Sequence, residues 1–168
     1  MSEGYEIVLW LLLGIATVTD LLWGKIHNAL TLPSIALGVG ARLYFGGMPS
    51  ALTALAAIAV AFAFFFPLFA IKTVAAGDAK LLMALGAWSD FTLVLKLGIL
   101  AILMGAVVGG FVLLRERGLV AASKSVAEHA QTAPGTSKSL TSFHMVFAPA
   151  FLVAFMFLKI AELKGWTW

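Results

Sequence analysis

The sequence predicts an all-α, polytopic membrane protein, a bundle of about six transmembrane helices. Composition is the first reason: of 168 residues, 62% are hydrophobic and only 11% are charged, and the mean hydropathy is +1.04. Soluble domains have a very different balance. The second reason is that apolar runs of about 20 residues, the length that crosses a bilayer, recur with short connections. A single integral membrane domain over residues 1–168 is therefore expected.

Six spans are predicted, and turn signals separate them. The first two are followed by the polar turn 24–28 and by the Gly-Gly-Met-Pro turn 46–49. The fourth apolar run is too short to cross a bilayer unless its helix begins before Asp78, which would bring that carboxylate to membrane depth. A single long connection, about 115–142, is expected to be a cytoplasmic loop. The six spans cover about 6–23, 29–45, 51–71, the region around 81–88, 91–114 and 143–163.

Individual features support these spans. The first run follows Glu3 and Glu6, whereas a secretory signal would have a basic leader and a small-residue cleavage site, so it is expected to be retained. The second run carries Pro33, and the third is the most apolar, with four phenylalanines before Pro67. Glycines in the fifth, such as Gly105, favour close helix packing.

Charge and cysteine content narrow the function. The net charge is +3, and basic residues next to membrane spans usually set the orientation of the protein against the cytoplasmic leaflet. No nucleic-acid partner is expected. Cysteine is absent, which excludes disulfides, thiol catalysis and cysteine-based zinc sites. With the N-terminus outside, seven basic residues lie on the cytoplasmic side and four lie outside: Lys25, Lys72, Lys80, Arg115, Arg117, Lys124 and Lys138 against Arg42, Lys96, Lys159 and Lys164.

Two aspartates lie where apolar runs meet polar turns. Asp20 falls in the last turn of the first span, and Asp78 precedes the fourth. A carboxylate next to lipid is costly and is usually retained for catalysis, ion transfer or substrate contact. The predicted orientation places both on the cytoplasmic face, where two carboxylates sharing a proton can activate a water. Each has a structural alternative, since Asp20 could end its helix and Asp78 could cap the next one.

The residues around both aspartates carry a family resemblance. Asp20 is followed by Lys25-Ile26-His27-Asn28, and Asp78 lies in Ala75-Ala76-Gly77-Asp78-Ala79-Lys80-Leu81. These segments resemble the D-x4-R/K-I-x-N and G-x-G-D-x-K-L signatures of prepilin peptidases. The number of spans and the Phe-Ala-Pro-Ala segment at 147–150 also match that family. A short chain without cysteines resembles its minimal, peptidase-only branch in Tad/Flp-type pilus systems, without N-methyltransferase activity.

The resemblance implies a function for each motif residue. It makes Asp20 and Asp78 the catalytic pair of an aspartic endopeptidase, with no metal or organic cofactor. Ala75 replaces the first glycine of the second signature, which costs nothing if its φ is negative. The supporting motif residues are Lys25, where arginine is common, Asn28 as a cap of the second span, Gly77 for close backbone approach, and Lys80 to orient the turn, balance charge or contact lipid phosphate.

The function expected from the resemblance is removal of a leader peptide from type IV or Flp-like prepilins at the cytoplasmic face of the inner membrane. The partners would be a prepilin, with its leader and hydrophobic helix, and membrane lipid. Two alternatives remain open: a small ion-coupled transporter and a catalytically inactive pilus-assembly protein. The pilin, the residues preferred around the cleaved bond and the oligomeric state are not encoded in a recognisable way.

Overall fold

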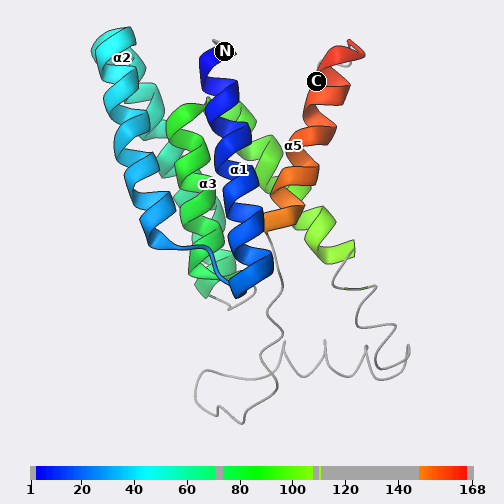
Figure 1. The fold of residues 1–168 in the computed structure, drawn as a ribbon. Coiled ribbons are helices and arrows are strands. Elements are labelled where there is room, and N and C mark those ends of the chain that lie inside the picture. The colour runs from blue at the N-terminus through cyan, green and yellow to red at the C-terminus, as the bar shows by residue number, and fades with distance from the viewer. Residues whose placement is uncertain (1–2, 71–73, 108–109, 111–147, 166–168) are drawn as a thin grey trace.

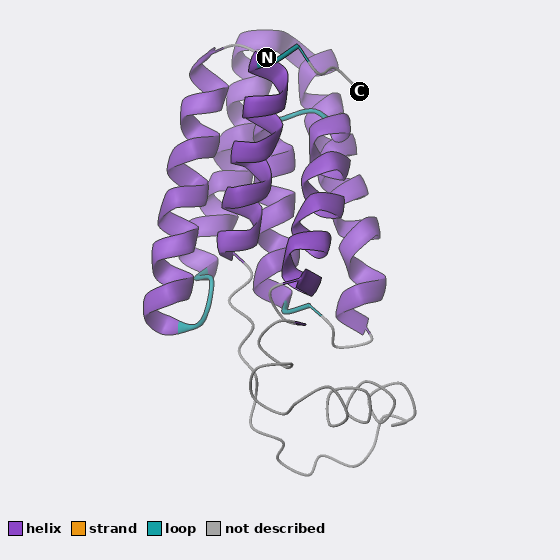
Figure 2. Ribbon diagram, turned by 90° about the vertical axis from the view of Figure 1, so that its right-hand side faces the viewer, coloured by secondary structure: helices purple, strands orange, loops and turns teal. Residues whose placement is uncertain are grey.

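A computed structural model describes residues 3–70, 74–107, 110 and 148–165. In these residues the chain is helical and contains no strand. The helices run alongside one another as a bundle (Figures 1 and 2). In chain order they are α1 (Glu3–Trp23), α2 (Asn28–Ala70), α3 (Ala76–Trp88), the helix Phe91–Val107, and α5 (Ala148–Leu163). The expected loop 115–142 and the start of the sixth span lie outside the described residues.

Helix α2 consists of two stretches that meet at Gly47. This residue has φ 68° and ψ −170°, a conformation that favours glycine because a side chain would be strained there. Arg42 Nη1 donates to Thr53 Oγ1 at 3.0 Å, although the residues are eleven apart. In a straight helix that separation is about 16 Å, so the chain must turn back between them. The two stretches correspond to the spans expected at 29–45 and 51–71, and the break falls in the predicted turn.

Helix α3 packs closely against both stretches of α2. A Cβ added at Gly38 would lie 2.8 Å from the Ala87 Cβ, and one added at Gly86 would lie 3.1 Å from the Ala57 backbone. Small residues at such crossings allow helix backbones to approach. The Trp88 indole nitrogen also donates to the Ser34 carbonyl at 3.0 Å. The C-terminal end of α3 is therefore held against both stretches of α2.

The first and last described helices lie side by side. The Trp10 and Phe155 rings meet edge to face, with centroids 4.8 Å apart. Lys159 of α5 forms an ion pair with Glu6 at 2.6 Å and another with Glu162 at 2.8 Å. These contacts fix the position of α5. The other end of that helix carries a backbone hydrogen-bond donor to Asp20.

The outer surface of the bundle is apolar. Large side chains such as Leu11, Leu37 and Phe45 are well exposed along the helices. Two helices, Gly4–Trp23 and Asn28–Ala70, are long and apolar enough to cross a membrane. An apolar exterior is stable in lipid, where burial of such side chains is not needed. A helical membrane bundle fits these findings, and the number of six spans stays a prediction.

Candidate active site at one end of the bundle

The two aspartates of the motifs lie at the same end of the bundle. Asp20 is in the last turn of α1 and Asp78 is in the first turn of α3, and these two helix ends lie at the lower edge in Figure 1. The first turn of α5 is the lower end of that helix in the same view, somewhat above the ends of α1 and α3. Each aspartate is only 5% exposed. Because buried carboxylates need polar partners, the contacts of each one define the site.

Asp20 is held by the beginning of α5. Its Oδ2 accepts a hydrogen bond from the backbone N–H of Ala148, the first residue of that helix, at 3.0 Å. The free N–H groups at a helix start carry partial positive charge and favour an anion. Pro149 follows within the first turn, where proline fits because its missing N–H has no helical partner. Ala148, within the Phe-Ala-Pro-Ala segment of the sequence, thus supplies a backbone donor to Asp20.

Asp78 is held by its own helix. Its Oδ2 accepts from the backbone N–H of Ala75 at 3.2 Å, which is the acidic half of a capping box. Asp78 is thus the third residue of α3 and not its N-cap. Ala75, the N-cap residue, has φ −76° and ψ 153°, an extended conformation open to any residue. Alanine therefore replaces the glycine of the family signature here without backbone strain.

The two carboxyl groups interact electrostatically. Helix α3 begins at Ala76, two residues before Asp78. It has 13 residues and is about 20 Å long, and it is not one of the two helices that are long and apolar enough to span a membrane. Burial and, to a smaller extent, the negative charge of Asp20 together raise the pKa of Asp78 from 3.8 to about 7, although the hydrogen bond from Ala75 lowers it. Near neutral pH, Asp78 can therefore carry a proton beside a second carboxylate.

The segments around the aspartates also pack together. A Cβ added at Gly77 would lie 3.3 Å from the Ile26 Cβ, so the glycine allows the turn after α1 to approach α3. Lys80 Nζ donates to Asn28 Oδ1 at 2.9 Å. Asn28 is the first residue of α2, and its capping role stays a prediction. The two motifs are joined directly by these contacts.

Not every motif residue is brought to the carboxylates. Lys25 is exposed in the turn after α1 and forms no ion pair with any residue that the structure describes. The sequence also gave no indication that Ala148 is a partner of Asp20. A backbone donor has no side-chain signature, and the sequence singled out the Phe-Ala-Pro-Ala segment only as a feature shared with the family.

The fold and the site together define a protein whose described residues form a helical bundle with two buried, interacting carboxyl groups at one end. Comparison with protein families gives a match to the type IV leader peptidase family over residues 7–110, more than half of the chain. The chain belongs to this family, and membership implies an aspartic-type peptidase. Comparisons with curated proteins and with solved structures give no match.

Proposed function

We propose that the chain is a membrane aspartic endopeptidase that removes the leader peptide from type IV or Flp-like prepilins at the cytoplasmic face of the inner membrane. One observation carries the proposal: the carboxyl groups of Asp20 and Asp78, each within a family motif, are buried and close enough to interact. Family membership supports the leader-peptidase class. The absence of cysteine supports a peptidase-only activity.

The contacts suggest different roles for the two aspartates. Asp20, which faces the N–H of Ala148, acts as the carboxylate that takes a proton from the attacking water. Asp78 carries a proton and donates it to the carbonyl oxygen of the scissile bond. The water oxygen adds to the carbonyl carbon, and the resulting diol collapses as a proton passes to the leaving amine. One water and one peptide bond thus give a carboxylic acid and an amine.

The position of the site fits a substrate that lies partly in lipid. A prepilin has a leader in the cytoplasm and a hydrophobic helix in the bilayer, so its scissile bond lies near the membrane surface. Asp20 lies in the last turn of an apolar helix that can span the membrane, and Asp78 lies in the first turn of α3. Both carboxylates are therefore at an end of the bundle, and a bond at the membrane surface can reach them without unfolding the substrate helix.

The test replaces each aspartate singly by asparagine and measures cleavage of a prepilin by the purified protein in lipid. Both Asp20→Asn and Asp78→Asn should lower the rate by about 1,000-fold or more, because neither can then act in proton transfer. Asp90→Asn, at the other end of the bundle, is the control and should cleave normally. Undiminished cleavage by either motif variant would contradict the proposal. Loss of ion flux with intact cleavage would indicate a transporter instead.

A further inference from the structure

A second polar cluster lies at the opposite end of the bundle from the two aspartates. Its centre is Arg42, which is only 5% exposed although it belongs to an apolar stretch of α2. The neighbours include Tyr5 near the start of α1 and Asp90 just after the end of α3. Asp20 and Asp78 lie at the other ends of those helices. The cluster is thus separate from the candidate active site.

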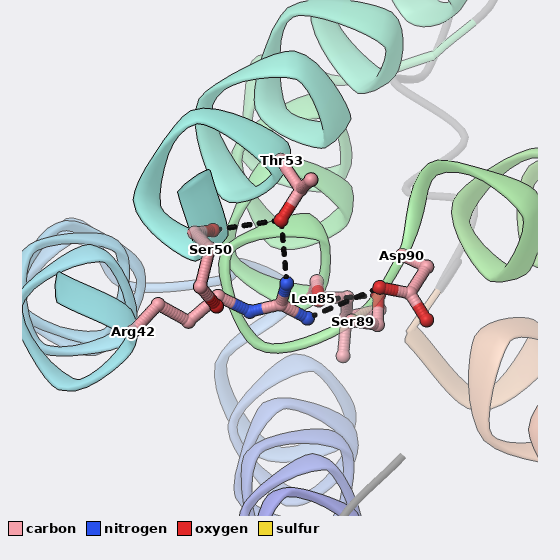
Figure 3. Close-up of polar contacts among 6 residues, drawn as sticks. All are labelled: Arg42, Ser50, Thr53, Leu85, Ser89 and Asp90. Atoms are coloured by element: carbon pink, nitrogen blue, oxygen red, sulfur yellow. Dashed lines mark hydrogen bonds and ion pairs between the residues drawn. The ribbon is translucent and has the colours of Figure 1, made fainter. Parts of the chain in front are cut away.

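The charge of Arg42 is only partly compensated. Figure 3 shows its guanidinium group between Thr53 and Asp90. Nη1 donates to Thr53 Oγ1 at 3.0 Å, and Nη2 reaches the Asp90 carboxylate only at 3.4 Å. The Asp90 side chain is 59% exposed, so water weakens this ion pair. Nε of Arg42 is buried and has no hydrogen-bond partner among the described residues. Buried donors are usually satisfied, so this one requires an explanation.

An open cavity of about 760 Å³ adjoins this guanidinium group. Its size is that of a typical small-molecule site. Aromatic side chains form part of its wall, and the hydroxyl groups of Tyr5 and Ser50 have no hydrogen bond within the described part of the chain. Gly4 and Gly46 add no side chains to the lining. The cavity therefore combines a buried cation, two available hydroxyl donors and an aromatic wall.

We infer that the cavity beside Arg42 binds a phosphate group, the chemistry shared by phospholipid headgroups and free phosphate. A guanidinium group is a strong donor to phosphate oxygens, and Nη2 of Arg42, whose partner Asp90 is 3.4 Å away, is the donor that a phosphate can take. Asp90 is a distant, exposed partner, so phosphate can replace it on Nη2 as the aspartate turns to water. Aromatic residues commonly lie at the headgroup level of a membrane, where a lipid phosphate would meet this end of the bundle.

The test uses the purified full-length protein in an uncharged detergent and measures bound ligand by native mass spectrometry, with Tm as a second readout. Three probes are added separately: phosphatidylglycerol, diacylglycerol with the same chains, and inorganic phosphate. Phosphatidylglycerol should bind and raise Tm, whereas diacylglycerol should not. Equal saturation by inorganic phosphate would identify the free anion as the source, and binding of the phospholipid alone would identify the headgroup. Equal binding of diacylglycerol and phosphatidylglycerol would overturn the inference.

Variants then test the residues. Arg42→Gln should weaken binding about tenfold or more, since it removes the cation, while Lys164→Gln removes an exposed cation at the same end and should change binding less than about twofold. Asp90→Asn should tighten binding severalfold, because it removes the competing carboxylate. If Arg42 and Asp90 formed only a structural pair, Asp90→Asn would not tighten binding. Asp90→Asn and Ser50→Ala remain informative even if Arg42→Gln fails to fold, and unchanged binding in both would contradict the site.

Discussion

Asp78 combines a structural contact with an unfavourable environment for its charge. Its carboxylate caps the start of α3 through Ala75, yet it is buried and faces the charge of Asp20. The first contact stabilises the helix, whereas burial and repulsion destabilise the ionised side chain. The pKa of about 7 shows that the second effect is the larger one. A residue retained under these conditions is a strong candidate for a function other than stability.

This environment predicts a pH-dependent gain in stability for Asp78→Asn. The folded-state pKa of Asp78, about 7, lies above the ordinary aspartate pKa of 3.8, so this group's contribution to stability is greatest at low pH and is lost as the pH rises toward 7. Asparagine removes this loss and keeps an oxygen for Ala75. The gain in the free energy of unfolding should therefore be larger at pH 8 than at pH 5, by an amount on the order of 2 kcal/mol. In Tm this difference is roughly 5 °C.

Thermal unfolding in detergent at both pH values measures this difference. Asp90→Asn is the control, because that side chain is 59% exposed and already solvated. A gain for Asp78→Asn that is equal at pH 5 and pH 8 would show that the carboxyl group is not held in an unfavourable environment.

At the scale of the elements, the site depends on how closely the turn after α1 approaches α3. Gly77 and Ile26 determine this approach, and Lys80 and Asn28 bridge the same two motifs. The glycine is helical and does not need a positive φ, so its importance comes from the absent side chain. A larger residue there must displace the turn that follows Asp20.

Gly77→Val should therefore lower prepilin cleavage by about 10-fold or more, because a small displacement of catalytic groups is costly. Gly77→Ala should have a milder effect, since its Cβ would be 3.3 Å from Ile26 and a small shift relieves the contact. Gly14→Val in α1 is a matched control, as a Cβ at Gly14 meets nothing within 4 Å. If both valine variants fold and cleave equally well, the close packing of the two motifs is not needed for activity and this prediction is wrong.

The sequence predicted the elements better than it predicted their contacts. Apolar runs and turn signals indicated the helices, the break at Gly47 and the start of α3 before Asp78, since these depend on local residues. The motifs singled out Asp20 and Asp78. The N–H of Ala148 and the burial of Arg42 were not predicted, because both arise only when distant helices pack. Arg42 was assigned to the outer side by charge counting alone, which does not show whether a cation lies inside the bundle.

For the whole molecule, the predicted orientation can be measured with little disturbance because the chain has no cysteine. Single cysteines introduced at Lys25 and at Lys164 lie at opposite ends of the bundle and are both exposed. In intact cells a membrane-impermeant maleimide should label Lys164→Cys, whereas Lys25→Cys should react only after the membrane is opened. The opposite pattern would place the aspartates outside the cell and would exclude cleavage at the cytoplasmic face.

The hydrogen bond from Ala148 to Asp20 also has a consequence for biosynthesis. Helix α1 leaves the ribosome first among the described helices, and α5 leaves last, yet the first N–H of α5 completes the environment of Asp20. Until α5 has been inserted and docked, Asp20 lacks this donor. A growing chain therefore holds an incomplete pair of carboxylates, and a ribosomal product that stops before residue 148 never acquires the finished pair. Under the proposed function, the order of synthesis delays proteolytic competence until the last of these helices is in place.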